Sequence, residues 1–348
     1  MVAPLNWGLG HATRCIPIID ALLEQNFEVL IASDSSSLLL LQKEFPNLES
    51  IELPPYRIKY PSNGSSFKWK MLFSLPHIYK TMIAEKKVVA EMVSRGAIDG
   101  IVSDGRFGVR SAEIPSVYIT HQLNVLTGKT SFFSSKLHQR IIKKFDACWV
   151  PDVKDMALNH SGMLGHLKVS SFPVHYFGIV SRMKKIEQPI SIDILALISG
   201  PEPQRTYFEN QLKKILTQSD KRIVVVRGVV ESEQKWTDHK NIRVVNFMES
   251  RELEATLNKS ELVISRSGYT TIMDLAMLEK KALFIPTPGQ YEQQYLAKRL
   301  NELGISPFCK QKEFKLDKLN AVAVYRGLKP YTYSSEEFSE LFSIFHGK

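Results

Sequence analysis

The amino-acid sequence predicts an α/β fold made of two tandem, doubly wound domains that face each other across a cleft. Short β-branched runs alternate with longer helical patterns along the chain, and this alternation occurs in two series. The stretch HYFGIVSRMKKIEQPI, which holds a glycine, a basic cluster and a proline, separates the two series. The length of 348 residues, 44% of them hydrophobic, suits two globular cores.

The first series indicates a Rossmann-like domain that spans residues 1–180. Its strands are predicted at 2–5, 27–32, 98–103, 116–120 and 146–150. Its helices are predicted near 12–25, 34–44, 76–95 and 131–144. Continuous apolar strands separated by helices indicate a parallel sheet that is covered on both faces.

The second series indicates a second Rossmann-like domain over residues 181–330. Its strands are predicted at 192–198, 222–227, 242–245, 261–265 and 282–285, and its helices near 204–218, 251–258, 269–279 and 291–303. Near the end, SSEEFSELFSIFHG reads as an amphipathic helix with Ser335 at the N-cap. We expect residues 331–348 to form this helix and to pack back on the first domain.

The composition limits the kinds of binding partner and the cellular compartment that we expect for the protein. The net charge of +9 and the isoelectric point near 9.2 favour an anionic partner. The three cysteines, Cys15, Cys148 and Cys309, fit neither a metal site nor a disulfide ladder. No apolar run approaches the ~18–20 residues of a spanning helix, and the N-terminus lacks the pattern of a signal peptide. We expect a cytoplasmic protein in a reducing compartment.

The first candidate site is the turn WGLGHATR (7–14), which follows the first strand. Ligands of doubly wound sheets bind at the carboxyl ends of the strands. Gly8 and Gly10 permit close backbone approach, and the amides of the helix start face an anion. His11 at this helix start has a pKa suited to taking a proton from a hydroxyl. From the residues alone, a His11 that only caps the helix or fills a polar pocket is supported equally well.

The second candidate site lies in the stretch 263–300. Strand 261–265 ends in Ser265-Arg266-Ser267-Gly268 and a helix follows, so the Ser267 hydroxyl and the helix amides form a natural phosphate cradle. Thr270 and Thr271 lie in the first turn of this helix, and Asp274 can accept hydrogen bonds from ribose hydroxyls.

After the next strand, the turn PTPGQYEQQ carries Gln290, Gln293 and Gln294, which can read sugar hydroxyls together with Glu292. The alternative is a tight turn followed by a solvated helix start. The order of turn, hydroxyls, carboxylate and glutamines favours a ligand site.

These motifs resemble the two-domain glycosyltransferases called GT-B, and in particular the MurG-like enzymes of family 28, in a bacterial subgroup. The resemblance covers most of the chain and is strongest at WGLGHATR (7–14), SRSGYTTIMDLA (265–276) and PGQYEQQYLAKRL (288–300). The stretches SDGRFGVRSAEIPSVYITHQLN (103–124) and ISGPEPQRTYFE (198–209) add to it. Enzymes of this group move N-acetylglucosamine from a UDP carrier to a lipid-linked acceptor.

The resemblance implies roles for individual residues. His11 is then the catalytic base, and Gly8 and Gly10 lie on the acceptor side. His121 is placed on the acceptor side by its own position, because it ends the strand 116–120 and so faces the same cleft. Asp274 falls where these enzymes place a ribose-binding glutamate, Gln293 and Gln294 match a pair near the donor sugar, and the backbone of Met248 falls where the uracil edge is read. With the phosphate-site residues, the expected donor-binding set is Ser199, Gly200, Arg205, Met248, Arg266, Ser267, Gly268, Thr270, Asp274, Gln293 and Gln294.

One loop departs from the family pattern. The first loop of the second domain is glycine-rich in the family, but here it reads Ser199-Gly200-Pro201-Glu202-Pro203-Gln204-Arg205. The prolines stiffen this loop and remove amide donors. Arg205 can supply the positive charge that those amides would have given.

The expected reaction is a single displacement that inverts the anomeric carbon of a nucleotide sugar. His11 deprotonates the acceptor hydroxyl, and the helix amides after Ser267, with Arg205 and Arg266, stabilise the departing diphosphate. We expect no metal and no cofactor, because no paired-carboxylate motif is present; SDG at 103–105 is interpreted as a strand-end turn.

The segment 56–87 is basic and aromatic, with seven lysine or arginine residues against one acid, Glu85. Such a segment suits an anionic membrane surface, so we expect a protein peripheral to the inner face of the membrane that acts on a lipid-linked or cell-envelope acceptor. A solvated loop followed by a core helix is supported equally well. A nucleic-acid partner is not expected, since no binding module frames the segment.

Three other functions stay open at this point. An epimerase or hydrolase of the same architecture would consume the nucleotide sugar without an acceptor. A binding module would hold the nucleotide sugar and would not need His11. A nicotinamide oxidoreductase would use Gly8, Gly10 and Asp34, although Thr13 stands where its third glycine belongs.

Overall fold

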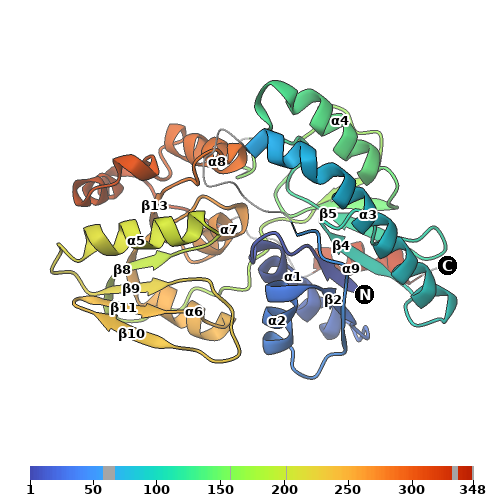
Figure 1. Cartoon of the computed structure of the whole chain (residues 1–348), viewed down its shortest axis with the longest axis horizontal. Helices are drawn as coiled ribbons and strands as arrows, with labels where there is room; N and C mark the ends of the chain where they lie inside the picture. The colour runs from blue at the N-terminus through green and yellow to red at the C-terminus, as the bar shows by residue number, and fades with distance from the viewer. Residues whose placement is uncertain (58–66, 157, 201, 331–335, 347–348) are drawn as a thin grey trace.

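The computed structural model describes residues 1–57, 67–156, 158–200, 202–330 and 336–346 (Figure 1). Its described residues form a seven-stranded sheet of order β3-β2-β1-β4-β5-β6-β7 and a six-stranded sheet of order β10-β11-β9-β8-β12-β13. Helices cover both sheets, and the two domains stand side by side (Figure 1). The predicted fold class, two Rossmann-like α/β domains, is confirmed.

The first sheet is parallel throughout, and its central strands are buried. Its order places β1 beside both β2 and β4, so the topological switch point lies between β1 and β4. The segments that follow these two strands therefore meet at one edge of the sheet. The elements are β1 (Val2–Pro4), α1 (Gly10–Glu24), β2 (Ile31–Ser33), α2 (Ser35–Glu44), β3 (Ser50–Glu52), α3 (Phe67–Ser94), β4 (Ile101–Asp104), β5 (Ser116–Ile119), α4 (Ser131–Ile142), β6 (Ala147–Val150) and β7 (Val174–Tyr176).

The second sheet has its switch point between β8 and β12. All its pairs are parallel except that of the exposed edge strand β10 with β11. The chain leaves the first sheet after β7 and enters this one at β8. The elements are β8 (Ile192–Leu197), α5 (Gln204–Leu216), β9 (Ile223–Val226), β10 (Trp236–His239), β11 (Ile242–Val245), α6 (Ser250–Asn258), β12 (Ser260–Ser265), α7 (Tyr269–Met277), β13 (Lys281–Phe284) and α8 (Tyr291–Glu302).

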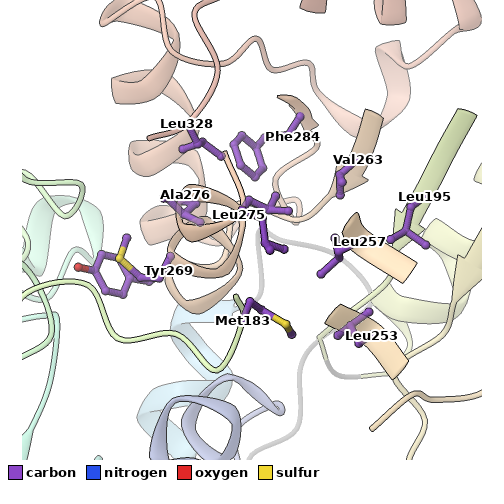
Figure 2. Close-up of a cluster of buried hydrophobic side chains, with 14 of the residues drawn as sticks. Met183, Leu195, Leu253, Leu257, Val263, Tyr269, Leu275, Ala276, Phe284 and Leu328 are labelled. Atoms are coloured by element: carbon purple, nitrogen blue, oxygen red, sulfur yellow. The ribbon is translucent and has the colours of Figure 1, made fainter. Parts of the chain in front are cut away.

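Apolar packing fixes α7 on the second sheet, as Figure 2 shows. Leu275 and Ala276 on this helix are fully buried, and they pack in one cluster with Val263 of β12 and Phe284 of β13. Burying a side chain such as leucine contributes about 1.5–3 kcal/mol. The cluster therefore holds the N-terminus of α7 in a fixed place at the end of β12.

The last described helix, α9 (Glu336–Phe342), belongs to the core of the first domain. Phe342 is fully buried there, and its ring centroid lies 5.8 Å from that of Trp149 and 6.0 Å from that of Phe27. Figure 1 shows α9 on the side of the first sheet, although it follows the second domain in sequence. Among the described residues, no helix combines the length and the apolar character needed to cross a bilayer.

Candidate active site

The two switch points face each other, and the starts of α1 and α7 touch across the domain boundary. The Thr270 hydroxyl on α7 donates a 3.0 Å hydrogen bond to the carbonyl oxygen of Gly10 on α1. A Cβ atom on Gly10 would lie 3.2 Å from this hydroxyl oxygen, so a larger residue would crowd the Thr270 side chain. In the described chain, neither helix start has a side-chain cap. The free amides at these starts suit an anion.

His11 in the first turn of α1 contacts a carboxylate at the end of β4. Its Nδ1 lies 2.9 Å from Oδ1 of Asp104, which is fully buried. Burial lowers the pKa of His11 below its usual value, and Asp104 offsets this only in part. Burial by itself would raise the pKa of Asp104, but Arg14 and His11 outweigh it and hold that pKa well below its usual range. The pair is thus a neutral imidazole beside a charged carboxylate at pH 7.

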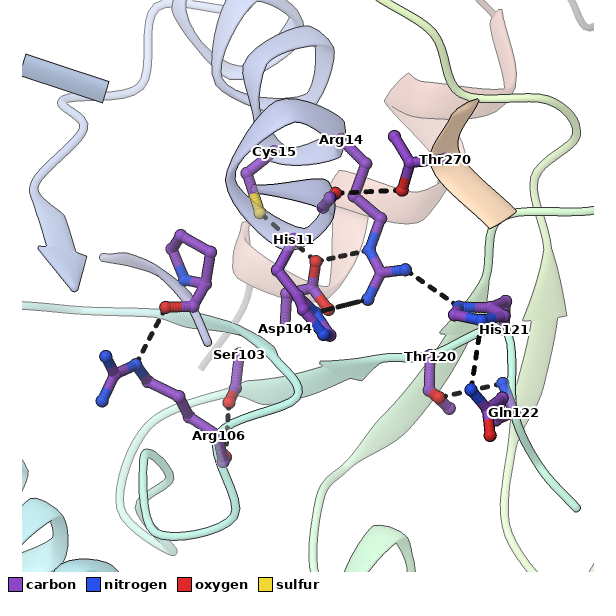
Figure 3. A network of polar contacts seen from close by, with 12 residues as sticks. His11, Arg14, Cys15, Ser103, Asp104, Arg106, Thr120, His121, Gln122 and Thr270 are labelled. Atoms are coloured by element: carbon purple, nitrogen blue, oxygen red, sulfur yellow. Dashed lines mark hydrogen bonds and ion pairs between the residues drawn. The ribbon is translucent and has the colours of Figure 1, made fainter. Parts of the chain in front are cut away.

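Arg14 lies one turn after His11 on α1 and binds both partners (Figure 3). Its guanidinium pairs with both carboxylate oxygens of Asp104 and also lies 2.7 Å from Nδ1 of His11. With 4% of its side chain exposed, Arg14 is a buried cation whose charge Asp104 compensates. Since Nδ1 of His11 is occupied, Nε2 is the nitrogen left for a substrate hydroxyl.

His121, directly after β5, connects this cluster to the second domain. Its Nδ1 lies 2.9 Å from Nη1 of Arg14, and its Nε2 lies 2.8 Å from Oε1 of Glu292 on α8. The His121 ring stacks on Tyr269 of α7, with centroids 4.3 Å apart and an angle of 2° between the planes. Helices α7 and α8 of the second domain thus both contact this side chain.

On the donor side, Ser267 ties the start of α7 to the start of α8. Its hydroxyl donates a 2.8 Å hydrogen bond to the carbonyl oxygen of Gln293. The side chain of Gln293 accepts a 2.8 Å hydrogen bond from the amide of Thr287, and that of Gln290 caps α8 by accepting from the amide of Gln293. Ser267, Gly268, Thr270 and Gln293 therefore lie together, at the edge that faces His11.

Other predicted donor residues lie behind this edge. Asp274 is buried on α7 and accepts a 2.6 Å hydrogen bond from Ser181, and burial raises its pKa. Arg266 is 1% exposed, and its guanidinium lies 3.8 Å from the centre of the Phe208 ring and donates to the carbonyl oxygen of Ile285. Burial lowers the pKa of Arg266 to about 9.

The remaining predicted residues surround the second switch point or lie beside it. Ser199 and Gly200 follow β8, where Gly200 has φ +99°, a conformation that favours glycine. The Arg205 guanidinium pairs with Glu202. Met248 is buried, whereas Gln294 is exposed on α8. Gly8, before α1, has φ +85° with open space around it.

Sequence reasoning missed Asp104 and Arg14. Asp104 stands in the SDG stretch, which was interpreted only as a strand-end turn, and it ends β4 at the switch point. Arg14 stands three residues after His11, a spacing that puts both side chains on one face of a helix. The signal that the sequence offered was an acidic residue directly after the apolar run IDGIVS. The part of the chain that the structure describes contains no group of three or more His, Cys, Asp or Glu residues that could hold a metal ion.

Similarity to solved structures identifies the fold of the protein. Over 99% of this chain and 98% of the other, it superposes on the glycosyltransferase SnogD from Streptomyces nogalater with a TM-score of 0.61 at 12% sequence identity. The spinosyn forosaminyltransferase SpnP gives a TM-score of 0.59 at 12% identity, over 99% of this chain and 91% of that one. These similarities show the fold, which is that of GT-B glycosyltransferases.

Sequence comparison then gives the family. Residues 205–337 match the glycosyltransferase family 28 C-terminal domain. The chain is 23% identical over 324 residues to the UDP-N-acetylglucosamine--N-acetylmuramyl-(pentapeptide) pyrophosphoryl-undecaprenol N-acetylglucosamine transferase of Pasteurella multocida (strain Pm70), covering 90% of this chain and 84% of that protein. The protein of the same name from Haemophilus influenzae (strain PittGG) is 23% identical over 315 residues, covering 87% and 82%. The second half of the chain thus carries a family 28 glycosyltransferase domain, and the whole chain is similar to MurG-like enzymes. The predicted resemblance and the predicted enzyme class, a glycosyltransferase, are confirmed.

Proposed function

We propose that this glycosyltransferase moves a sugar from a UDP-linked donor to the hydroxyl of a lipid-linked or cell-envelope acceptor, with inversion and without a metal. The relatives carry UDP-N-acetylglucosamine and a pyrophosphoryl-undecaprenol acceptor in their names. The observation that carries the proposal is the contact between the starts of α1 and α7. It sets the His11–Asp104 pair against a helix N-terminus suited to a diphosphate.

In this mechanism, Nε2 of His11 takes the proton of the acceptor hydroxyl. The acceptor oxygen forms a bond to the anomeric carbon while the bond from that carbon to the diphosphate oxygen breaks, and the nucleoside diphosphate leaves. Asp104 stabilises the imidazolium that forms, since its carboxylate is 2.9 Å from Nδ1. The amides at the start of α7 stabilise the negative charge of the leaving group.

Calorimetry with UDP, GDP and dTDP sugars and with NAD tests the donor class. We expect saturable binding of a UDP sugar only, and transfer to a polyprenyl-diphosphate-linked acceptor that continues in EDTA. His11→Ala should abolish transfer while the donor still binds. Binding of NAD alone, or unchanged transfer by a folded His11→Ala variant, would overturn the proposal.

The same assay separates the alternatives. An epimerase or hydrolase would convert the UDP sugar fully in the absence of acceptor. A binding module would show donor binding with no turnover under any condition. Loss of transfer in the presence of EDTA, restored by added Mg²⁺, would contradict the metal-free mechanism alone.

We also propose that the first domain docks on an anionic membrane. Of the segment 56–87, residues 58–66 and the side chains of 67–74 lie outside the described residues. The described part of α3 still exposes Tyr79 and Ile83 beside Lys80. Helix α4 adds exposed Phe132, Phe133 and Leu137, with Lys129 and Lys136 near them and no acidic residue on the helix. Exposed basic and aromatic side chains on these two helices match anionic headgroups and the acyl boundary.

A further inference from the structure

A buried relay of polar contacts runs from the candidate base to the second domain. Asp104 binds Arg14, Arg14 binds His121, and His121 binds Glu292. The first three residues lie on the first domain, and Glu292 lies in the first turn of α8 on the second. The His121 and Glu292 side chains are 9% and 17% exposed, so this cross-domain pair is largely shielded from water. The mechanism above uses neither of them.

The donor and acceptor roles of its neighbours determine which ring nitrogen of His121 carries the proton. A guanidinium only donates, so Nδ1 of His121 must accept the 2.9 Å hydrogen bond from Arg14. The His121 proton is then on Nε2, from which it is donated to Glu292. Stacking on Tyr269 holds the plane of the ring, and the Tyr269 hydroxyl is itself anchored by a 2.6 Å hydrogen bond to the carbonyl oxygen of Pro151.

The position of Arg14 in turn decides which ring nitrogen of His11 carries the proton. Nδ1 of His11 lies between an acceptor, Oδ1 of Asp104 at 2.9 Å, and a donor, Nη2 of Arg14 at 2.7 Å. If Nδ1 donates to Asp104, Nε2 has a free lone pair and is a base. If Nδ1 accepts from Arg14, the proton is on Nε2 and His11 cannot take another from the acceptor.

We propose that Glu292 is a positioning residue that makes His11 competent only when the two domains are together. Glu292 orients His121, His121 holds Arg14 on Asp104, and Asp104 is then free to accept the Nδ1 proton of His11. This inference rests on the proposed function, in which His11 is the base. The domain that binds the donor would thus also bring His11 into the form that can accept a proton.

A role for Glu292 in holding the donor sugar is the competing explanation. Both carboxylate oxygens are already engaged, since Oε1 accepts from His121 and Oε2 lies 3.2 Å from the side-chain amide of Gln290. A sugar hydroxyl would have to share or replace these contacts. If Glu292 is a positioning residue, its removal lowers kcat and leaves donor affinity unchanged. If Glu292 holds the donor sugar, its removal weakens donor affinity and leaves kcat unchanged.

The experiment compares Glu292→Ala, Glu292→Gln and the control Tyr295→Phe. Tyr295 is on the same helix, and its hydroxyl accepts a 2.9 Å cross-domain hydrogen bond from the amide of Met163, outside the relay. We expect Glu292→Ala to lower kcat about 10- to 100-fold with donor Kd unchanged, as for a misplaced catalytic group. Glu292→Gln keeps an acceptor for His121 and should retain most of the activity. Tyr295→Phe should leave kcat unchanged.

Equal loss of kcat in Glu292→Ala and Tyr295→Phe would overturn the proposal, because it would show a general effect of weaker domain contact. Weaker donor binding with unchanged kcat in Glu292→Ala would overturn it in favour of sugar binding. The ¹⁵N NMR signals of the histidine rings test the relay even if the wild-type enzyme transfers no sugar. We expect the Nδ1–H form of His11 in the wild type and in Tyr295→Phe and its loss in Glu292→Ala, because Nδ1 of His11 would then accept from Arg14. Identical spectra in all three proteins would contradict the relay, whereas wild-type spectra as expected without transfer would contradict only the proposed function.

Discussion

Asp104 is the charge on which the polar cluster of the first domain depends. It is fully buried and compensates the buried guanidinium of Arg14. Removing one partner of such a pair leaves an uncompensated charge in the interior, which costs about 3–5 kcal/mol. We therefore expect Asp104→Asn to lower the free energy of unfolding by about this amount and to abolish transfer, as measured by urea unfolding and by the acceptor assay.

The exposed pair of Glu91 with Arg95 on α3 is the control for this substitution. Glu91→Gln should leave the unfolding free energy nearly unchanged, because solvent screens exposed pairs. The pKa of Asp104 is lowered in the folded protein, so its stabilisation is complete above the unfolded value of about 3.9 and is lost as the pH falls below it. The stability difference between wild type and Asp104→Asn should thus shrink below about pH 4. If the stability difference between the two proteins stayed constant below pH 4, Asp104 would not be the buried charge that stabilises this cluster.

The lowered pKa of His11 predicts the pH dependence of activity. A general base acts in its neutral form, and burial moves the pKa of His11 below the usual 6.5. As the pH falls from 8, kcat/KM should decline with a midpoint below pH 6.5. A pH profile measured at subsaturating donor checks this, and an acidic midpoint at or above 6.5 would exclude His11 as the base in this environment.

At the residue level, the sequence allowed us to predict functional side chains that lie just before or at the start of a helix. It did not allow us to predict the residues from distant parts of the chain that contact them. His11 could be singled out from its glycine turn. Its contact with Asp104 joins residues 93 positions apart, and it exists because β4 pairs with β1 in the sheet. Strand order is a property of the whole domain, so the local pattern SDG could not reveal it.

Among the elements, α9 makes a contribution to stability that its length does not suggest. Its Phe342 ring is fully buried among aromatic rings of the first domain. Truncating a buried phenylalanine to alanine costs about 3–5 kcal/mol through lost burial and the remaining cavity. Phe342→Ala should destabilise the protein by this amount in urea unfolding. Val324→Ala, at a side chain that is 84% exposed, should change stability by less than about 0.5 kcal/mol. Similar values for both variants would show that α9 is not part of the core.

The long elements could be predicted because each has a clear pattern of its own. Strands β1, β4, β5, β8, β11 and β12 and helices α1, α2 and α4–α8 lie within a few residues of the predicted ranges. Strands β3, β7 and β10 were missed. They have only three or four residues with partly or fully exposed side chains, so they lack the continuous apolar run of the central strands.

At the scale of the whole molecule, the proposed docking surface on α3 and α4 predicts how the protein binds lipid vesicles. The protein should float with vesicles that contain anionic phosphatidylglycerol and less with neutral phosphatidylcholine, and salt should weaken the binding. Because burying each phenylalanine contributes about 1.5–3 kcal/mol, the double substitution Phe132→Ser, Phe133→Ser should weaken binding at least about 10-fold.

Val324→Ser, at a side chain that is 84% exposed in the second domain, is the matched control and should bind like the wild type. Equal flotation of all three proteins, or equal binding to neutral vesicles, would contradict membrane docking through α4.

The return of α9 to the first domain has a consequence for the cohesion of the two halves. The polypeptide passes between the two sheets once after β7 and again before α9. Phe342 of α9 is buried in the core of the first domain, so non-covalent packing at α9 holds the two halves together in addition to the chain between β7 and β8. A protease that cuts either connection alone would therefore yield two fragments that still migrate together until a denaturant separates them.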